Sequence, residues 1–315
     1  MAYSTPLRAL HLNSVPKFPD FALLDVVHKN EFEEYTKFYP PYSDFNFTSL
    51  WAYNTEEDVK ISQLNGNMVM KFRDYITNDQ FYTFLGHQNV EQTVQELLQK
   101  SKEENIEPVL KLIPEINLAY APELINTFIV TEDPDNNDYI LSSLEVGELK
   151  SRKFTDKRNL VNRFLRDHPD VTIVQLDLDD PVIQDQILDI FNRWETKKGK
   201  RKQDTEHEYK AIQRLFHPAI ASHLIAFGIF RNGDLIGFLI IEEIHDNYAI
   251  FHFMKADPDH KGTYEFLNHW AAKHVFSHGL LHINYEQDLG IEGLRRAKTF
   301  WNPTHFLKKY TIAEK

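Results

Sequence analysis

The chain has 315 residues, enough for two domains of about 150 residues each. Of these residues 42% are hydrophobic, including 23 phenylalanines, and this content excludes a disordered protein. It contains no cysteine, so disulfide bonds, thiolate metal sites and cysteine nucleophilic catalysis are excluded. The formal net charge of −12 argues against a general nucleic-acid-binding protein and against DNA as a partner.

The first half predicts a helix, three strands, a second helix and a further strand. Its N-terminal stretch, MAYSTPLRALHLNSVPKFPDF, has neither the apolar core nor the cleavage pattern of a signal peptide. A helix is predicted up to Pro40-Pro41, and Ser43 or Asp44 is placed to cap a short helix or turn after it. Asn65-Gly66-Asn67 is a hairpin turn between two strands, FYTFLG is another strand, and VEQTVQELLQKSKEEN has amphipathic helical spacing.

The second half follows TEDPDNNDYILS at residues 131–142, a polar, turn-rich stretch that is the best candidate for a domain boundary. A basic helix over 155–167, the strand VTIVQLDL and two further helices are predicted next. Three strands follow, with hairpin turns at Arg231–Asp234 and His245–Asn247. A helix that ends at Gly279 and the strand LLHINYE lead into the charged stretch NYEQDLGIEGLRRAK.

Both halves therefore show helices first, then antiparallel hairpins, then strand, helix and strand. We predict an α/β (α+β) protein with two tandem domains over residues 1–140 and 141–315, each a mixed, mainly antiparallel sheet flanked by helices. No apolar run approaches the roughly 20 residues of a transmembrane helix. We expect a cytoplasmic protein that contacts membranes at most peripherally.

Charge is divided unequally between the halves. Residues 1–150 hold 11 Lys and Arg against 24 Asp and Glu, a net of −13, whereas residues 151–315 hold 24 against 23, a net of +1. The cations of the second half gather in two clusters, at 150–166 and 193–202. These clusters indicate phosphate-bearing ligands on the second half, although ordinary solvated helix faces would give the same pattern.

The order of elements in the second half resembles that of the GNAT acyltransferases. In that fold the loop before the central helix binds the pyrophosphate of acyl-coenzyme A through backbone N–H groups at the helix N-terminus. The corresponding loop here is DPDHKGTYEFL, in which Lys261 supplies charge, Gly262 allows close backbone approach and Thr263 can cap the helix. A plain helix N-terminus would contain the same residue types.

The closing stretch, NYEQDLGIEGLRRAKTFWNPTHFLKKY, resembles the signature of a bacterial family related to the C-terminal domain of phosphatidylglycerol lysyltransferases. That signature reads Asn-x-Glu-x-Asp-x-Gly-x-x-Gly-Leu-Arg-x-x-Lys, then a Pro and a Lys-Tyr. The chain matches it at Asn284, Glu286, Asp288, Gly290, Gly293, Leu294, Arg295, Lys298, Pro303, Lys309 and Tyr310.

Three further segments, SDFNFTSLWAY, DKRNLVNRF and FHFMKAD, extend this similarity over most of the chain. Met254 stands where relatives often carry an acidic residue. The resemblance implies two tandem GNAT-like acyltransferase domains, with the ligand site in the second. It also implies acyl or aminoacyl transfer.

Such a transfer needs a base for the nucleophile and groups that stabilise the carbonyl oxygen. Glu286 and Asp288 are candidate catalytic bases, because both would face one side if the strand continues through them. Alternatively they pair with the cations of 295–298, or Arg295 holds Asp288 while Glu286 faces the ligand. Tyr310 is a candidate general acid, with aromatic packing as its alternative role.

The candidate residues for substrate or cofactor binding are Lys255, Lys261, Gly262, Thr263, Asn284, Arg295, Lys298, Lys157 and Arg158. Lys157 and Arg158 open the basic helix and could touch a tRNA backbone or a nucleotide, or form a salt bridge between domains. Gly290 and Gly293 indicate positive φ or a close backbone approach.

The fifteen histidines show no metal-binding pattern, because His-x-x-x-His pairs lack a third ligand at a useful spacing. His252 and His282 lie within strands and are predicted to be core residues. We predict no metal and no tightly bound cofactor, with acyl-coenzyme A or aminoacyl-tRNA as a co-substrate.

The leading hypothesis is a GNAT-superfamily transferase that moves an acyl or aminoacyl group from acyl-coenzyme A or aminoacyl-tRNA to an amine or hydroxyl. The alternative is a non-catalytic ligand-binding or scaffold protein that retains the duplicated fold. An aminoacyl-tRNA donor predicts that the two cation clusters form one continuous surface. The acidic first half would be repelled by anionic lipid, which disfavours a lipid acceptor.

Overall fold

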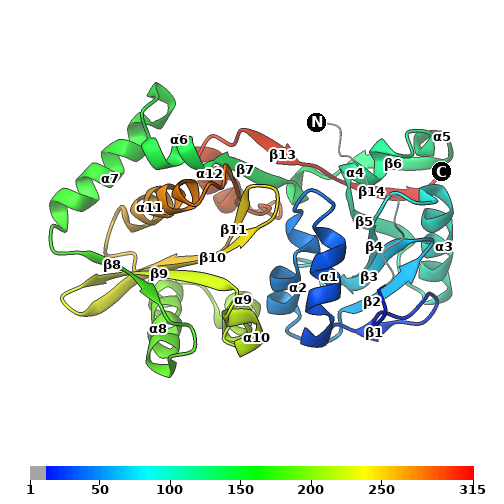
Figure 1. The fold of residues 1–315 in the computed structure, drawn as a ribbon, viewed down its shortest axis with the longest axis horizontal. Coiled ribbons are helices and arrows are strands. Elements are labelled where there is room, and N and C mark those ends of the chain that lie inside the picture. The colour runs from blue at the N-terminus through cyan, green and yellow to red at the C-terminus, as the bar shows by residue number, and fades with distance from the viewer. Residues whose placement is uncertain (1–11) are drawn as a thin grey trace.

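In the computed structural model, which describes residues 12–315, the chain folds into two units that lie side by side, each around its own strands (Figure 1). The first unit holds the four-stranded sheet β1-β2-β3-β4 and the three-stranded sheet β5-β14-β6. Its strands are β1 (Ala22–Leu23), β2 (Lys60–Leu64), β3 (Asn67–Arg73), β4 (Gln80–Leu85), β5 (Val109–Pro114), β6 (Phe128–Glu132) and β14 (Lys309–Glu314). Its helices are η1 (Val26–His28), α1 (Lys29–Thr36), η2 (Ser43–Phe45), α2 (Phe47–Tyr53), α3 (Val90–Glu103), α4 (Glu115–Ala119), α5 (Leu124–Thr127) and η3 (Pro134–Asn136).

The second unit is built on one seven-stranded sheet in the order β13-β7-β12-β11-β10-β9-β8. Its strands are β7 (Asp138–Ser142), β8 (Thr172–Leu176), β9 (Leu224–Arg231), β10 (Asp234–Ile244), β11 (Tyr248–Ala256), β12 (His282–Asn284) and β13 (His305–Leu307). Its helices are α6 (Ser143–Glu148), η4 (Arg152–Phe154), α7 (Thr155–Asp167), α8 (Pro181–Lys197), α9 (Lys202–Arg214), α10 (Pro218–Ala221), α11 (Thr263–Ser277) and α12 (Glu292–Phe300).

The duplicated α/β unit predicted from the sequence is confirmed by the order of these elements. In each unit a first strand and helices precede an antiparallel run of three strands, which a long helix connects to the next strand. The two Asn-Gly hairpins form as expected, because Asn65 and Gly66, like Asn232 and Gly233, adopt the positive φ angles that such a turn requires.

One strand is exchanged between the units, because the last strand of the chain, β14, leaves the second unit and joins a sheet of the first. β7 lies between β12 and β13 of the second unit and pairs antiparallel with both. β14 lies between β5 and β6 of the first unit, again antiparallel to both. The division predicted at residue 140 falls inside β7, and the stretch predicted as a polar linker is largely strand because Tyr139, Ile140 and Leu141 are buried in the sheet.

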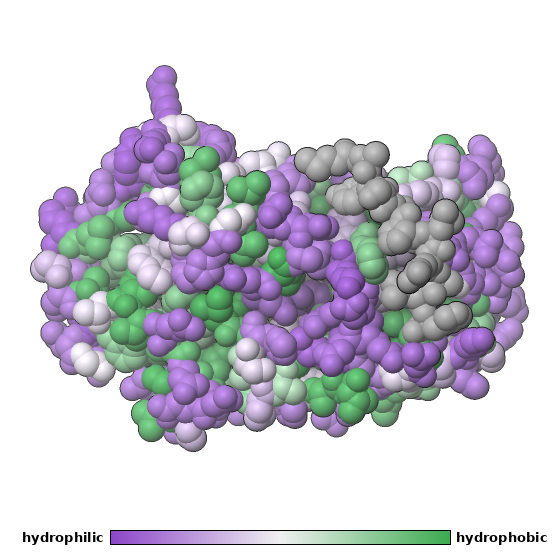
Figure 2. Space-filling view, viewed as in Figure 1, coloured by the Kyte–Doolittle hydropathy of each residue, from purple (hydrophilic) through white to green (hydrophobic). Residues whose placement is uncertain are grey.

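Hydrophobic side chains form three cores, and the largest is shared between the units. In the shared core, Phe32 and Phe47 of the first unit belong to the same buried cluster as Phe191 and Phe238 of the second. A second core fills the space between the seven-stranded sheet and α6, α7 and α11, and a third lies against α3. Figure 2 shows hydrophobic side chains gathered over the second unit, at the left.

Two local predictions are wrong. The side chain that caps α2 is Asn46, whose Oδ1 accepts a hydrogen bond from the Ser49 amide at 2.8 Å, whereas Ser43 and Asp44 form the short helix η2 before it. Gly293 lies in α12 without a positive φ or a close neighbour. Gly290 does meet the expectation, since its φ is +71° and an added Cβ would lie 2.8 Å from Asp135 Oδ2.

Ile312 tests the strand exchange, because it lies in β14 yet is fully buried in the core beside α3. Ile312→Ala should lower the free energy of unfolding by about 2–5 kcal/mol, the usual effect of such a cavity. Its neighbour Thr311 is less buried, and Thr311→Ala should change stability by only about 0.5 kcal/mol. Urea unfolding followed by circular dichroism measures both, and equal effects would contradict the pairing of β14 within the first unit.

Candidate active site

A polar site forms where β11 and β12 separate. The two strands pair in parallel only between Tyr248–Ile250 and His282–Asn284, after which β12 ends while β11 continues to Ala256. Glu286 follows with a left-handed φ of +55°, and its amide donates to Asn284 Oδ1 at 2.7 Å. The strand therefore does not continue through Glu286 and Asp288, which was the condition for both carboxylates to face one side, and after the turn the two carboxylates contact different partners.

The Glu286 carboxylate faces His252 of β11. Glu286 Oε1 lies 3.3 Å from His252 Nδ1, and on the other side of the ring Glu242 Oε2 of β10 lies 3.2 Å from His252 Nε2. Only 1% of the His252 side chain is exposed, against 17% for Glu286. The imidazole of His252 thus links the partly accessible carboxylate of Glu286 to the buried carboxylate of Glu242.

The pKa of His252 is set by its two acidic neighbours. Burial alone would lower this pKa, but the hydrogen bonds and charges of Glu242 and Glu286 raise it to about 9. Burial would also raise the pKa of Glu242, but its contact with His252 holds that pKa below the usual value. At neutral pH the ring is therefore a cation between carboxylates.

The first unit contributes two more groups through the start of α2. Asn46 Nδ2 donates to Glu242 Oε2 at 2.8 Å, and Ser49 Oγ lies 3.3 Å from His252 Nδ1 and 3.4 Å from Glu286 Oε1. The site consequently spans the interface between the units, and neither half of the chain contains all of it.

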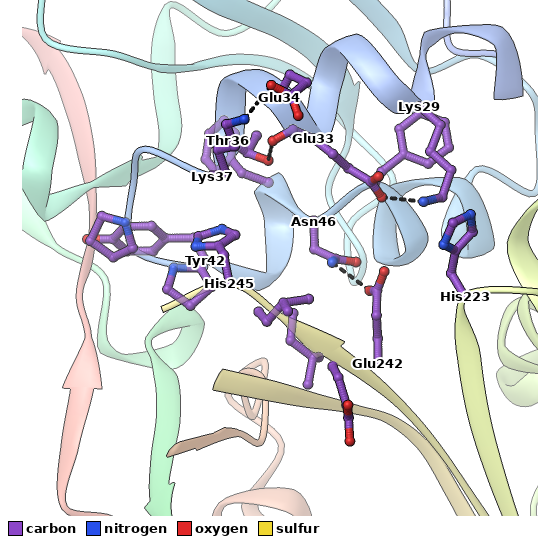
Figure 3. Close-up of a pocket in the computed structure, with 17 residues that line it drawn as sticks. Lys29, Glu33, Glu34, Thr36, Lys37, Tyr42, Asn46, His223, Glu242 and His245 are labelled. Atoms are coloured by element: carbon purple, nitrogen blue, oxygen red, sulfur yellow. Dashed lines mark hydrogen bonds and ion pairs between the residues drawn. The ribbon is translucent and has the colours of Figure 1, made fainter. Parts of the chain in front are cut away.

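Glu242 also borders a pocket of about 260 Å³ between α1 and the end of β10 (Figure 3). In this close-up, Lys29, Glu33 and Lys37 lie on the α1 side and Glu242 and His245 on the opposite side. The carboxylate of Glu242 thus connects the pocket to His252 and, through the ring, to Glu286.

Asp288 is buried and has all its acceptor positions engaged. Its Oδ2 accepts from the Tyr139 hydroxyl at 2.5 Å and from Arg295 Nε at 2.8 Å, and its Oδ1 accepts from an Arg295 amino group at 2.9 Å and from the Gly290 amide at 2.8 Å. Burial would raise its pKa, but these partners, Arg295 first, lower it overall. Of the alternatives the sequence left open, the pairing of Asp288 agrees with the one in which Arg295 holds Asp288.

A second buried cluster joins β14 to β7 and η2. Lys309 of β14 lies between Asp44 of η2 and Asp138 of β7, with its Nζ in contact with Asp44 Oδ2 and 2.7 Å from Asp138 Oδ1, and all three side chains are 0% exposed. Burial would lower the pKa of Lys309, but Asp138 and Asp44 raise it above its usual value. Asn284 Nδ2 donates to Asp138 Oδ2 at 3.1 Å, which links this cluster to the Glu286 turn.

Lys298 of α12 is the cation next to this turn. Its Nζ donates to the Tyr285 carbonyl oxygen, and it lies 4.8 Å from the centroid of the Tyr285 ring. Burial lowers its pKa to about 8, although Glu286, Asp138 and Asp288 act in the opposite direction. A lysine with such a pKa gives up a proton near neutral pH more readily than a solvated one.

Two of the predicted residues lie apart from this site. Tyr310 faces the opposite side of β14 from Lys309, with its hydroxyl 3.5 Å from Glu115 Oε1. Lys255 of β11 pairs with Glu208 of α9 at 2.5 Å and lies 4.2 Å from the Trp194 ring centroid.

The predicted pyrophosphate loop is covered by α7. An added Cβ on Gly262, whose φ is +95°, would lie 3.0 Å from Phe164 Cβ and 3.2 Å from the Leu160 carbonyl oxygen. Glycine is therefore required at position 262 because α7 packs closely against the backbone there. Thr263 Oγ1 donates to the His260 carbonyl oxygen at 2.6 Å, whereas Lys261 is exposed.

Two cations of the basic helix α7 contact other parts of the same chain. Arg158 donates to the Leu149 carbonyl oxygen at 2.6 Å, and Lys157 is buried 4.2 Å from the Phe300 ring centroid. The two cation clusters are divided between opposite faces of the sheet, with α7 beside α11 and α8 below (Figure 1). They therefore do not form the continuous surface that was expected for an aminoacyl-tRNA donor. Within the described chain, several of their members pair with nearby carboxylates: Lys150, Lys153, Arg193, Lys197 and Arg201.

Sequence reasoning missed His252, Glu242 and Lys309 as members of the two clusters. His252 was expected to be a core residue, and it is buried, but only the structure places a carboxylate on each side of its ring. The match of Lys309 to the family signature was the feature of the sequence that could have indicated its role. Glu242 had no signal beyond its place, next to Glu243, near the end of a largely apolar strand.

The sequence comparison now decides the family. Residues 36–313 match the model of the family described as "Phosphatidylglycerol lysyltransferase, C-terminal". The chain belongs to this family. A comparison with curated proteins finds no match.

Solved structures with the same fold extend over nearly the whole chain. A conserved protein of unknown function from Bacteroides thetaiotaomicron is 25% identical, with a TM-score of 0.80 over 94% of this chain and 99% of its own. The C-terminal domain of a putative lysylphosphatidylglycerol synthetase from Agrobacterium fabrum is 13% identical, with a TM-score of 0.64 and 92% of each chain covered. L-PGS from Bacillus licheniformis is 13% identical, with a TM-score of 0.58 over 84% of this chain and 86% of its own.

The Agrobacterium fabrum and Bacillus licheniformis structures share the fold of this chain, and the mixed, mainly antiparallel α/β fold in two units agrees with the sequence prediction. Between residues 12 and 315, no helix of this family member combines the length and the apolar character needed to cross a bilayer.

Removing the buried ammonium group should expose the repulsion between its two acidic partners. Lys309→Met leaves Asp44 and Asp138 buried and unneutralised, which should lower the free energy of unfolding by about 3–5 kcal/mol. Burial raises the pKa of Asp44, and the variant lacks the Lys309 charge that opposes this rise, so the stability of the variant should fall as pH rises. Urea unfolding at pH 5 and pH 8 checks this, and a second change, Asp44→Asn, should restore part of the loss. A loss equal at both pH values and unaffected by Asp44→Asn would rule out a repulsive origin.

The charge on His252 predicts a pH-dependent contribution to stability. Because its pKa rises from 6.5 to about 9 on folding, this contribution is complete below pH 6.5 and is lost as pH rises through 9. The difference in unfolding free energy between the natural protein and His252→Gln should therefore shrink between pH 6 and pH 10. A difference independent of pH would show that the ring is neutral in the folded protein.

Proposed function

We propose that this protein is an aminoacyltransferase that moves an amino acid from the ester of an aminoacyl-tRNA to an amine or hydroxyl acceptor, with Glu286 as the general base. The observation that carries the proposal is the placement of Glu286. Its left-handed turn at the end of β12 presents a partly accessible carboxylate where β11 and β12 separate, in a chain of the lysyltransferase C-terminal family.

In the proposed reaction the acceptor nitrogen or oxygen attacks the ester carbonyl carbon. A bond from the acceptor to that carbon forms, the bond from the carbon to the ribose oxygen breaks, and the proton of the acceptor passes to Glu286. The ribose oxygen takes a proton from Lys298, whose lowered pKa of about 8 suits it to this role. Solvent then returns the proton from Glu286 to Lys298, so that no covalent enzyme intermediate is needed.

His252 would act as a positioning residue. Held between Glu242 and Glu286, the imidazolium group orients the Glu286 carboxylate by a contact at 3.3 Å. It also offsets one of the two negative charges, which keeps Glu286 from binding the acceptor as a permanent ion pair. The remaining carboxylate, Glu242, is fixed by Asn46 of the first unit.

Two contacts argue against acyl-coenzyme A as the donor, whereas the division of the two cation clusters between opposite faces means that a bound tRNA would contact only one of them. Gly262, where a pyrophosphate would approach the backbone, is packed against Phe164 and Leu160 of α7. The first turn of α11 already holds an acidic side chain, Glu265, which would repel phosphate groups there. The name of the family describes transfer of a lysyl group to phosphatidylglycerol, so lysine and this lipid are the first donor group and acceptor to test.

The test is a transfer assay with the full chain. Total bacterial tRNA charged with radiolabelled amino acids is supplied with either phosphatidylglycerol vesicles or free amino acids as acceptors, and acetyl- and longer acyl-coenzyme A are supplied in parallel. The natural protein should move label from tRNA to one acceptor class. Glu286→Gln should lower the rate constant by about 10²–10⁴, the usual contribution of a general base.

Glu206→Gln is the matched control, because Glu206 is an exposed carboxylate on α9 paired only with Lys210 in the described structure. This variant should keep the full rate. Transfer from acyl-coenzyme A alone would overturn the proposed donor, and full activity of Glu286→Gln would overturn the proposed base. Absence of transfer from every donor by the folded protein would favour the scaffold alternative.

A further inference from the structure

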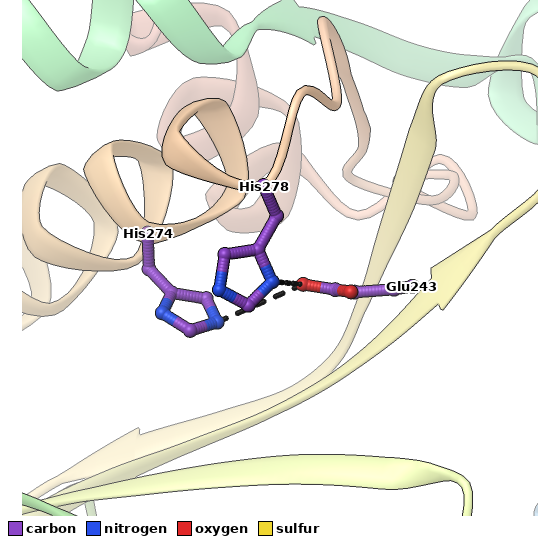
Figure 4. A group of neighbouring side chains, drawn as sticks. All are labelled: Glu243, His274 and His278. Carbon is purple, nitrogen blue, oxygen red and sulfur yellow. Dashed lines mark ion pairs between the residues drawn. The ribbon is translucent and has the colours of Figure 1, made fainter.

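A cluster of two histidines and a glutamate lies on the face of the seven-stranded sheet opposite the candidate active site. Glu243 follows Glu242 in β10, and since successive strand residues point to opposite faces, its carboxylate lies on the side covered by α11. Figure 4 shows Glu243 pointing from the strand toward His274 and His278 at the C-terminal end of that helix.

The distances in this cluster suit a single metal ion. Glu243 Oε1 lies 2.7 Å from His278 Nδ1 and 3.7 Å from His274 Nε2, and one ligand atom from each residue lies within 4.8 Å of the others. Ligands of a tetrahedral zinc ion with bond lengths of about 2.0–2.1 Å are roughly 3.3 Å apart, which falls between the two measured separations. Small side-chain rotations would therefore complete the site.

The spacing of the histidines explains why they converge. His274 and His278 are four residues apart, so they lie on one side of the last turn of α11, with ring centroids 4.1 Å apart. The sequence shows histidines four residues apart but no third ligand at a useful spacing. The third ligand comes from β10, and this contact could not be read from the spacing within the helix.

The ligand atoms lack other partners. His274 Nε2 and Glu243 Oε1 are shielded from solvent, and among the described residues neither forms a hydrogen bond, since the approach of His278 to Glu243 is an ion-pair contact only. Buried polar atoms are normally satisfied, so two unsatisfied atoms that face each other indicate a missing positive partner. The C-terminal end of α11, with its partial negative charge, favours a cation at the same place.

The surroundings hold His274 ready to bind. Its ring stacks on Trp270 at an interplanar angle of 11° and meets the edge of Phe227 with centroids 4.9 Å apart.

We propose that Glu243, His274 and His278 bind one divalent transition-metal ion, of which Zn²⁺ is the representative. Two imidazole nitrogens and one carboxylate oxygen suit Zn²⁺, Co²⁺ or Ni²⁺ and disfavour Mg²⁺ and Ca²⁺, which take oxygen ligands. The ion would tie β10 to α11, and its fourth position would be open to water. This site is independent of the proposed transfer reaction.

The test is zinc binding by the tag-free full chain after treatment with a chelator. Isothermal titration with Zn²⁺ should give one site per chain, Co²⁺ should give the visible absorption bands of a tetrahedral complex, and bound Zn²⁺ should raise the melting temperature. Loss of a residue that merely orients a ligand weakens metal binding about 10- to 100-fold. His274→Ala and His278→Ala remove ligands themselves and should weaken it at least as much.

His207→Ala is the matched control, because His207 is an exposed histidine on α9 that contacts Thr55 rather than the cluster. It should leave the affinity for Zn²⁺ unchanged, as should a large excess of Mg²⁺. Circular dichroism verifies that each variant is folded. The proposal is overturned if the natural protein binds no Zn²⁺ in the titration, or if the affinity survives in the folded double variant His274→Ala, His278→Ala.

Discussion

Lys309 is a completely buried cation, and it remains charged because two carboxylates from distant parts of the chain surround it. Taking an ammonium group out of water is unfavourable by several kcal/mol unless opposite charges and hydrogen bonds replace the solvent. Asp44, Asp138 and Lys309 come from η2, β7 and β14, so the charges can neutralise each other only when the exchanged strand β14 lies beside both units. The cluster thereby makes the strand exchange a condition of folding.

Hydrogen bonds from this cluster hold the turn that positions Glu286 in the candidate active site. Asp138 accepts a hydrogen bond from Asn284, and the side-chain oxygen of Asn284 in turn accepts from the amide of Glu286. The turn that aims Glu286 at His252 is therefore fixed by a hydrogen-bonded path that begins at the buried cluster. On the other side of the same turn, the pairing of Asp288 with Arg295 holds the chain as it enters α12.

The features that could be predicted from the sequence are local, and those that could not depend on contacts between distant residues. α7 begins and ends at the predicted residues, and both Asn-Gly turns form, because spacing and turn chemistry act within a few positions. The partners of β7 and β14 lie more than a hundred residues away in sequence. Burial of Lys309 contradicts the usual exposure of lysine, and so only the assembled fold reveals it. For the same reason, Glu286 was identified as a candidate, but its partner His252 was not.

The strand exchange also has a consequence for how the protein is made. Domains commonly fold one after another as the ribosome releases them, the N-terminal one first. Here the sheet between β5 and β6 has no central strand until residues 309–314 have been synthesised, by which time nearly all of the second unit already exists. The nascent first unit would present two open strand edges throughout this interval, and exposed edges favour pairing with other chains. The first unit therefore cannot complete this sheet until nearly all of the second unit has been made.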